Sequence, residues 1–521
     1  MLKRLTVRRF RSLADVTVEL PRLAVLVGTN AAGKSNLLEA IQALSWIGNQ
    51  RTLADAFEPL RGYPLETFQF GAGGWPALFR NGAASFTLEA DVSTHGGGNY
   101  RYRVQPEMDF TSGELRVRDE YLTQLTKAGR QRKNATAVIE RHRNTVRVRR
   151  KGKPGSPRQE ALGLNHALLS DRSLAGDGYP WLEDVRNELL NWRTYYLEPR
   201  TAMRRQQSPA DVFDIGKHGE CIASFLYKIR AQSRNHFDAV GRALRSIVPG
   251  IDALHVQLNE QQGTLDLWTQ EGEATYSARL ISEGTLRVIA PCAIVVNPWG
   301  GSLVALEEPE NGVHPRRLEL IARLLASLAL DQGRQVIVTT HSLLLCSAIL
   351  REARARDSDD ISLFNVRRVD HRTEIQRFDA NARLFQDLEI AEGLTTPLKT
   401  RCSGTSSSAD SWMSDRATAA TERLMKTQAV LASVLAFSSP AAAQTVIDLP
   451  GEDRPLSGEA EFVYRIGSAV AAEAWKSSHR FEAEGRPRLD GPIPRAGGSP
   501  LPALFLRHGD RSGDGDNTAT N

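Results

Sequence analysis

The chain has 521 residues, of which 41% are hydrophobic and 24% are charged, and it carries a net charge of +5. These proportions are ordinary for a soluble globular protein, and the length allows two to four domains. The four cysteines lie far apart and none forms a C-x-x-C pair, so the sequence does not suggest a zinc site or a disulfide framework, and a reducing cytoplasm is the simplest location. Because no run reaches about 18 apolar residues, an ordinary membrane span is excluded.

The N-terminal segment predicts strands, a glycine-rich loop and a helix in that order. Residues 1–10 alternate basic and apolar residues and lack the apolar region of a secretory signal, and further strands are predicted at 16–20 and 23–27. The last strand leads directly into Gly28–Ser35, which fits the P-loop pattern G-x-x-x-x-G-K-[ST]. Residues 36–44 then have apolar residues at helical spacing. Because all eight positions fit, a glycine-rich turn that matches by chance is a weak alternative.

Each residue type in the P-loop has a physical reason. Gly28 and Gly33 let the backbone turn its N–H groups toward a phosphate in conformations that side chains disfavour. Lys34 can reach the β- and γ-phosphates, and the Ser35 hydroxyl can ligate Mg²⁺. The following helix presents its N-terminus to the same anion. We therefore expect a nucleotide and Mg²⁺ to bind at this loop.

The pattern after this helix is first turn-rich, at 62–82, and then typical of β-structure. Strands are predicted at 85–92 and 100–104, with a hairpin loop at 96–99 between them. Farther along, the sequence predicts one helix at 181–192 and about two helices within 221–247. Shorter strands are predicted in and after this region, at 194–199, 254–258 and 264–268. No sustained heptad repeat occurs, which excludes a long coiled coil.

The segment 127–158 is strongly basic, with Glu140 as its single acidic residue. Weakly alternating apolar residues predict a basic β-hairpin. Two interpretations remain open: a solvated charge run, or a surface that contacts the phosphates of DNA or RNA. The segment lacks aromatic residues, so base stacking is not indicated. The basic residues are Lys127, Arg130, Arg132, Lys133, Arg141, Arg143, Arg147, Arg149, Arg150, Lys151, Lys153 and Arg158.

Two later strand patterns end in residues that suit phosphate chemistry. Residues 302–310 form an apolar run that ends in Glu307 and Glu308, and acids at the carboxyl end of a core strand lie where ligands bind. One carboxylate can hold Mg²⁺ and its neighbour can orient or deprotonate the attacking water. The next strand pattern, at 334–342, ends in Thr-Thr-His-Ser, and we expect His341 to contact the γ-phosphate. Before both, residues 280–287 combine a helix-cap residue, a glycine and a helix start, a weak signal alone.

Together these motifs resemble the ABC-type ATPases of the RecF/SMC group, and most closely RecF-like AAA family ATPases related to the nucleotide-binding domain of OLD (overcoming lysogenization defect) nucleases. The resemblance covers about residues 1–390. The motifs that carry it are Val7–Leu13 for the F-[RK]-[SG]-[LI] opening, Gly28–Asn36 for G-x-N-x-x-G-K-S-N, Ile281–Thr285 for a degenerate signature, Glu307–Pro315 for E-E-P-E-x-x-x-H-P, and Thr340–Ser342 for the switch.

The resemblance implies an α/β fold, a P-loop NTPase of ABC type with a β-rich N-terminal lobe, a helical insertion and a poorly structured C-terminal tail. Five segments follow from it: 1–126, the first part of the ATPase domain with the Walker A loop; 127–185, a basic insertion; 186–270, a helical and β lobe; 271–392, the second part of the domain with the signature, Walker B and switch histidine; and 393–521, a linker and tail.

The resemblance also implies a head-to-tail homodimer that holds ATP between two protomers. Glu308 would be the catalytic base, with His341 and Lys34 acting on the phosphates, and Ser35 with Glu307 would hold Mg²⁺. The wider ABC group has aspartate at the position of Glu307, so ligation through water is an alternative. The nucleotide-binding residues would be Gly28, Asn30, Gly33, Lys34, Ser35 and Asn36 of one protomer and Ser282 and Gly284 of the other.

Three further expectations concern single features of this resemblance. Gln69 is the candidate for the group's Q-loop glutamine, on position alone. Pro291, inside the helix expected after the signature, should kink or shorten that helix. Nuclease members of the group carry a TOPRIM domain, whereas after His341 only an edge hairpin at 361–366 and 373–378 is predicted, so we expect no nuclease in this chain.

The pattern changes at residue 393. Residues 425–444 contain a methionine, a lysine, a short apolar run and an A-x-A site, the composition of a secretory signal peptide in the interior of the chain. One interpretation is that residues after about 395 do not belong to the ATPase and that Met425 begins a separate exported protein. The other is an amphipathic helix followed by a tail. Residues 480–521 are expected to be disordered in both cases.

The leading functional prediction is an ATP-hydrolysing switch whose dimer closes on ATP and opens on hydrolysis, in DNA repair or anti-phage defence. In the alternative, the ATPase is a sensor or scaffold that holds and releases an effector protein without contacting DNA. A transporter ATPase is disfavoured because the signature is degenerate and the F-R-S opening is present.

Overall fold

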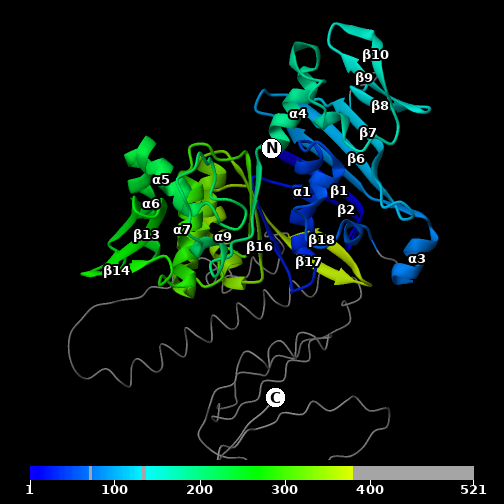
Figure 1. Ribbon diagram of the computed structural model, residues 1–521. Helices are drawn as coiled ribbons and strands as arrows, with labels where there is room; N and C mark the ends of the chain where they lie inside the picture. Colours follow the sequence, from blue (N-terminus) through cyan, green and yellow to red (C-terminus); the bar gives the residue numbers. More distant parts are fainter. Residues whose placement is uncertain (70–72, 132–135, 379–521) are drawn as a thin grey trace, which may run out of the picture. The chain divides into compact units, whose positions relative to one another are not determined.

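The computed structural model of the chain describes residues 1–69, 73–131 and 136–378, which all belong to one structural unit (Figure 1). The predictions for 393–521, including the signal-peptide-like segment 425–444, lie outside the described residues. The division into five segments therefore stays a prediction.

A six-stranded sheet positions the P-loop. Five of its strands are parallel, and the central ones are buried on both faces, which explains their continuous apolar sequences. In order across the sheet the strands are β11 (Trp192–Tyr195), β15 (Leu303–Glu307), β16 (Gln335–Thr340), β3 (Leu23–Val27), β17 (Ile361–Val369) and β18 (Arg372–Arg377).

The structure corrects two predictions for this sheet. The strand expected at 194–199 covers Trp192–Tyr195 instead, so Tyr196 is the first residue after it. The hairpin of β17 and β18 was expected at the edge of the sheet. Of these two strands only β18 lies at an edge, because β17 pairs with β3. The first six residues of β17 are all buried, and all but Ser362 and Asn365 are apolar, which suits an internal strand.

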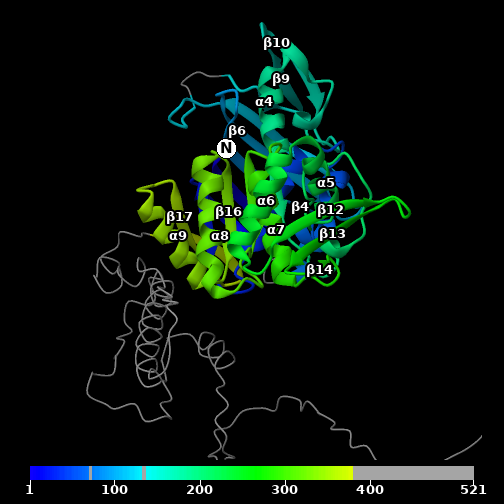
Figure 2. The same ribbon diagram turned by 90° about the vertical axis from the view of Figure 1, so that its left-hand side faces the viewer.

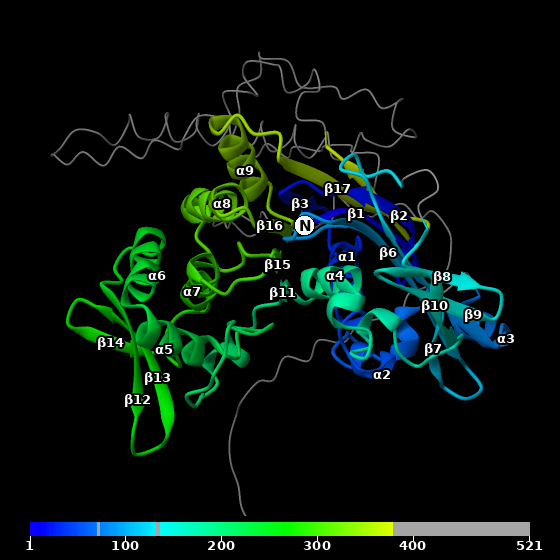
Figure 3. The same cartoon turned by 90° about the horizontal axis from the view of Figure 1, so that it is seen from above.

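Helices cover both faces of the parallel sheet. Figure 3 shows α7, α8 and α9 on one side of β15 and β16, with α1 and α4 on the other. Alternate residues of β15 accordingly point to different cores: Leu303 and Ala305 pack with α1, and Val304 and Leu306 with α7 to α9. These helices are α1 (Lys34–Ile47), α4 (Pro180–Leu190), α7 (Glu283–Val296), α8 (Leu318–Ala326) and α9 (Leu343–Ala355).

An antiparallel sheet of nine strands packs on the α1 side and forms the β-rich N-terminal lobe. It confirms the predicted hairpin around residues 96–99 and shows that the basic segment continues the same sheet as three strands at its end (Figure 1). Its strands are β1 (Leu2–Phe10), β2 (Leu13–Glu19), β4 (Ala83–Ser85), β5 (Thr87–Ser93), β6 (Asn99–Asp109), β7 (Leu115–Gln124), β8 (Ile139–His142), β9 (Thr145–Arg150) and β10 (Lys153–Ala161).

The remaining elements are short helices and a small three-stranded sheet, seen with α6 and α7 in Figure 2. They confirm the helices and strands predicted after residue 220, and they place helical turns in the segment predicted as turn-rich. The elements are α2 (Leu53–Phe57), α3 (Gly74–Arg80), α5 (Ile222–Gln232), α6 (Arg234–Ile247), β12 (Ala253–Asn259), β13 (Thr264–Glu271) and β14 (Ala274–Ser277).

Pro291 was expected to kink or shorten its helix. It lies inside α7, which continues to Val296, so the helix is not shortened, and the kink stays a prediction. Proline removes one backbone donor from a helix. Here Pro291 and its neighbours Ala290 and Cys292 are buried, so the helix continues past the proline inside the core. Among the described residues, no helix is long and apolar enough to cross a membrane.

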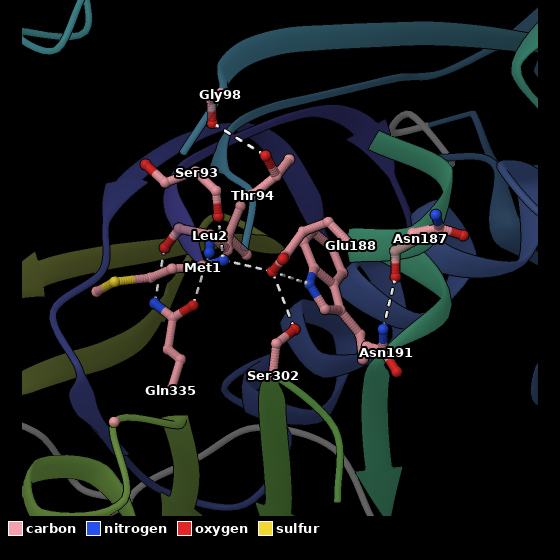
Figure 4. A network of polar contacts seen from close by, with 12 residues as sticks. Met1, Leu2, Ser93, Thr94, Gly98, Asn187, Glu188, Asn191, Ser302 and Gln335 are labelled. Carbon is pink, nitrogen blue, oxygen red and sulfur yellow. Dashed lines mark hydrogen bonds and ion pairs between the residues drawn. The ribbon is translucent and has the colours of Figure 1, made fainter. Parts of the chain in front are cut away.

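Polar contacts join the two large sheets where β1 meets β16 (Figure 4). The buried Gln335 amide accepts a hydrogen bond from Leu2 N (2.7 Å) and donates to Leu2 O (2.7 Å) and Pro21 O (3.0 Å). Nearby, Glu188 on α4 accepts from Ser302 Oγ (2.9 Å) and from the Trp192 indole (3.2 Å). Gln335 and Glu188 thus fix the start of the parallel sheet against the N-terminal lobe.

Replacing Gln335 with leucine is expected to lower the free energy of unfolding by about 1–3 kcal/mol, because the N–H and C=O of Leu2 lose their partner in a buried place. Urea unfolding measures this change. Gln257→Leu is the control, since Gln257 is an exposed residue of β12, and it should change stability by less than about 0.5 kcal/mol. Equal effects of the two substitutions would contradict the role given to Gln335.

Candidate nucleotide site

The P-loop connects β3 to α1 and is tightly enclosed by the end of the parallel sheet. Gly33 has φ of 105°, in the region that favours glycine, and a Cβ there would lie 2.0 Å from Thr373 Oγ1. A Cβ on Gly28 would lie 2.2 Å from the carbonyl oxygen of Val366. Both glycines are therefore required by the packing of the loop against β17 and β18.

Lys34 is buried and its ammonium group is folded back onto the loop. Nζ donates to the carbonyl oxygens of Gly28 (2.8 Å) and Thr29 (3.0 Å). Burial lowers the pKa of Lys34, while the negative charges of Glu308, Glu307 and, more weakly, Glu310 act in the opposite direction. The ammonium group of Lys34 thus lies within electrostatic range of Glu307 and Glu308, the two carboxylates predicted for this site.

The acidic strand end meets the start of α1. Ser35 Oγ donates a hydrogen bond to Glu307 Oε1, so the two proposed Mg²⁺ ligands are in direct contact. A hydroxyl and a carboxylate are the oxygen donors that Mg²⁺ prefers, and the two residues fit such an ion. Because β3, β15 and β16 are parallel neighbours, Lys34, Ser35, Glu307, Glu308 and His341 all follow strand ends at one edge of the sheet. These five residues are called the nucleotide site below.

Glu308 is held by two neighbours and by its backbone. Asn311 Nδ2 donates to Glu308 Oε2 (2.7 Å), and His341 Nδ1 lies 3.2 Å from Glu308 Oε1. Burial alone would raise the pKa of Glu308, but the hydrogen bonds from Asn311 and His341 and the charges of His341 and Lys34 lower it below its usual value. Glu308 also has φ of 46°, a strained conformation that functional residues often adopt. The carboxylate is thus fixed and ionised.

Glu310 is a further acid of the site that the sequence did not assign a role. It is buried, Thr340 Oγ1 donates to its Oε1, and its Oε2 makes no hydrogen bond within the described part of the chain. Burial raises the pKa of Glu310, partly offset by the hydrogen bond from Thr340. In the sequence Glu310 could have been noticed as the third acidic residue of the Glu-Glu-Pro-Glu motif.

A second group of contacts fixes the first turn of α1 against the N-terminal lobe. Asn36 Nδ2 donates to Ser12 Oγ (2.7 Å), which lies 2.6 Å from Thr373 Oγ1. The buried Glu39 forms ion pairs with Arg11 (2.8 Å) and Arg61. The Phe-Arg-Ser opening therefore supports the P-loop. Arg11 and Ser12 were visible in that motif, whereas Thr373 and Arg61 gave no sequence signal.

The other predicted site residues lie apart from this cluster or face solvent. Asn30 is exposed. Ser282 is the exposed N-cap of α7, and its Oγ accepts from Thr285 N (3.1 Å). Gly284 packs against the loop after Glu308, where a Cβ would lie 2.0 Å from Gly312 O. Gln69 is partly buried, with its backbone N bonded to Arg9 O (3.0 Å). The roles of all four stay predictions.

Comparison with known proteins agrees with the motifs. The family model described as "AAA domain, putative AbiEii toxin, Type IV TA system" matches residues 23–347. The OLD nuclease of Thermus scotoductus is 24% identical over 355 residues, which cover 66% of this chain and 59% of the relative. The DNA replication and repair protein RecF of Synechocystis is 36% identical over 113 residues, 21% of this chain and 28% of RecF. The chain thus spans less than two thirds of either relative.

Solved SMC head structures are also similar. An SMC head bound to the C-terminal winged-helix domain of ScpA has a TM-score of 0.44 at 13% identity, covering 73% of this chain and 98% of that one. The SMC head domain of Thermotoga maritima has a TM-score of 0.35 at 15% identity, covering 73% and 99%. The family match shows that the chain belongs to this AAA-domain family, and with its curated relatives it identifies the chain as a RecF- and OLD-like ABC-type ATPase.

Proposed function

We propose that the chain is an ATP-hydrolysing molecular switch that acts as a homodimer. The observation that carries the proposal is the convergence of the nucleotide site: a P-loop lysine, a hydroxyl in contact with one carboxylate, and a second carboxylate fixed by a histidine, all at one edge of a parallel sheet. Such a set suits the cleavage of a phosphoanhydride by water, because catalysis there depends on positioning and charge.

Each residue has a distinct part in this reaction. Glu308 orients the attacking water and takes its proton, and His341 next to it contacts the γ-phosphate. Lys34 exchanges the Gly28 and Thr29 carbonyls for phosphate oxygens and balances their charge. Ser35 and Glu307 would hold Mg²⁺, which supplies neutralisation of the phosphate charge.

The second half of the site would come from another copy of the chain. Ser282 and Gly284 make no hydrogen bond with the P-loop within the described residues, and Ser282 faces solvent. In the proposed dimer they close over ATP bound to the partner, and hydrolysis opens the dimer. The test is phosphate release and light-scattering mass of the purified full chain with Mg·ATP. Turnover with an ATP-dependent dimer is expected, and a chain that neither binds nor hydrolyses ATP would overturn the proposal.

The cellular role we propose is DNA repair or anti-phage defence, in the cytoplasm and without nuclease activity of this chain. The name of the RecF relative, a DNA replication and repair protein, supports the first role, and the toxin in the family description supports the second. In the alternative, the chain is a sensor or scaffold that binds and releases an effector protein. The two roles differ in nucleic-acid binding, which only the first requires of this chain.

A basic surface on β8 to β10 supports the nucleic-acid role. Val146 and Val148 of β9 are buried in the core, so the alternating residues Thr145, Arg147 and Arg149 share the other face of the strand. Arg149 is bound to Glu140 and to Ala137 O (2.8 Å). Arg147, by contrast, has no ion-pair partner in the described residues and lines a hollow of about 590 Å³ with Arg143. Arg143 and Arg147 are therefore the residues proposed to contact phosphates.

Changing Arg143 and Arg147 together to alanine is expected to reduce the slope of log affinity for duplex DNA against log salt by about 2, one for each lost phosphate contact. Fluorescence anisotropy of the full chain at several salt concentrations measures this slope. Arg149→Ala removes an arginine that is already paired, and should change the slope much less. If the unchanged chain fails to bind DNA at low salt, the nucleic-acid role is wrong and the effector alternative gains support.

A further inference from the structure

Tyr196 directly follows β11, the strand that neighbours β15 with the proposed Mg²⁺ ligand Glu307, and no sequence motif indicated a role for it. β11 pairs in parallel with β15, and Tyr195 is opposite Leu306, so Tyr196 follows at the level of Glu307. In Figure 3, β11 is the strand next to β15. Tyr196 therefore stands at the same edge of the sheet as the nucleotide site.

The side chains of Tyr196 and Glu307 lie on the same face of the sheet. On β15, Ala305 packs on the α1 side and Leu306 on the opposite side, which places Glu307 on the α1 side with Ser35. On β11, Tyr195 belongs to the opposite core, whereas Tyr196 packs with the core around α1. Neighbouring strands thus present the phenol and the carboxylate together.

The ring of Tyr196 is firmly positioned. Its backbone N donates to Lys217 O (2.8 Å), and His218 Nδ1 lies 2.9 Å from its carbonyl oxygen. Lys217 Nζ lies 5.1 Å from the centre of the Tyr196 ring and 5.3 Å from that of Trp46 on α1. Nothing in this packing requires the hydroxyl.

The Tyr196 hydroxyl is buried and makes no hydrogen bond with the described residues. Buried polar groups in native proteins are nearly always bonded, so such a group needs an explanation. Burial raises its pKa, and the charges of Glu39 and Glu307 raise it further, against Arg61 and Arg11. The carboxylate of Glu39 already forms ion pairs with both of these arginines. The Tyr196 hydroxyl is thus left without a partner among the described residues, on the face of the sheet that also carries Glu307, and its oxygen is available as an acceptor.

We propose that Tyr196 is a positioning residue of the nucleotide site, whose hydroxyl oxygen accepts a hydrogen bond from a water ligand of the Mg²⁺ held by Ser35 and Glu307. Mg²⁺ usually keeps several waters, and a water whose lone pair is on the ion can only donate hydrogen bonds. The inference rests on the proposed function, since it is the bound nucleotide that brings Mg²⁺ to this place.

The test is Tyr196→Phe in the full chain, with Tyr195→Phe as the matched control on the opposite face. Binding of mant-ATP, a fluorescent ATP analogue, is titrated with Mg²⁺ and also measured in EDTA, and urea unfolding is recorded for each variant. For Tyr196→Phe we expect roughly a tenfold rise in half-saturating Mg²⁺, unchanged binding in EDTA and no loss of stability. For Tyr195→Phe, which loses a hydrogen bond to Asp214 (2.5 Å), we expect a lower urea midpoint and an unchanged Mg²⁺ requirement.

The possible outcomes separate this inference from the function on which it rests. If the unchanged chain shows no Mg²⁺-dependent binding of mant-ATP, the proposed function itself fails. If it does, and Tyr196→Phe has the same Mg²⁺ requirement, only the role of Tyr196 is wrong. Weaker binding of Tyr196→Phe in EDTA together with a lower urea midpoint would show a structural role and also overturn the proposal.

Discussion

Replacing Glu308 with glutamine is expected to lower the ATP turnover of the full chain by roughly 10²- to 10⁴-fold, the usual contribution of a general base. Glutamine keeps the shape of the side chain and can still contact Asn311, but it cannot accept the proton of the attacking water. Lys34 and Ser35 are unchanged, so ATP still binds. Phosphate release measures the turnover, and anisotropy of mant-ATP measures the binding.

The same substitution should enrich the dimer, because ATP that is not hydrolysed keeps the two protomers together. Glu114→Gln, in the exposed turn between β6 and β7, is the matched control and should leave both turnover and dimerisation unchanged. A Glu308→Gln chain that hydrolyses ATP as fast as the unchanged chain would remove Glu308 from the reaction.

Replacing Lys34 with alanine is expected to weaken ATP binding by about 2–5 kcal/mol, or roughly 30- to 5,000-fold, because a buried cation that meets the phosphates is lost. Turnover falls with it. Unlike Glu308→Gln, this variant should not accumulate an ATP-bound dimer. Titration of mant-ATP measures the affinity.

Lys3→Ala is the control for charge, since Lys3 is an exposed lysine of β1, and it should bind ATP like the unchanged chain. Circular dichroism establishes whether Lys34→Ala folds, because Lys34 also donates to Gly28 O and Thr29 O. A folded Lys34→Ala chain with unchanged ATP affinity would show that the P-loop does not hold the phosphates.

The central part of the fold could be predicted from the sequence because its signals are local. Gly28–Ser35 lies between a strand and a helix, and the acids at Glu307 and Glu308 end an apolar run; each pattern is complete within about ten residues. Parallel strands then bring their carboxyl ends together without further information. Predicted residues of the nucleotide site are therefore close in the structure, although their roles stay predictions.

What could not be predicted depends on contacts between residues far apart in the chain. Tyr196 reaches the level of Glu307 only through the register of β11 with β15, and Thr373 encloses Gly33 only because β18 folds back beside the P-loop. Nothing in the sequence distinguishes the arginines of the basic segment from one another. In the structure Glu140 forms an ion pair with Arg149, whereas Arg147 has no ion-pair partner among the described residues. Pairing of this kind is decided by which side chain is near which, and no spacing reveals it.

In the proposed dimer a complete ATP site needs residues of two chains, and mixing two inactive variants tests this directly. Ser282→Arg blocks the proposed signature contact on an exposed position, and Lys34→Ala disables the P-loop. Ser282 is preferred to Gly284, because Gly284 has no room for a Cβ within its own chain.

In a dimer of one Ser282→Arg chain and one Lys34→Ala chain, the intact P-loop of the first meets the intact signature of the second, and one complete site forms. In an equal mixture half of the dimers are of this kind, and each has one complete site of two, so we expect roughly a quarter of the ATP turnover of the unchanged chain. Turnover of the mixture that stays at the level of the separate variants would contradict a site shared between two protomers.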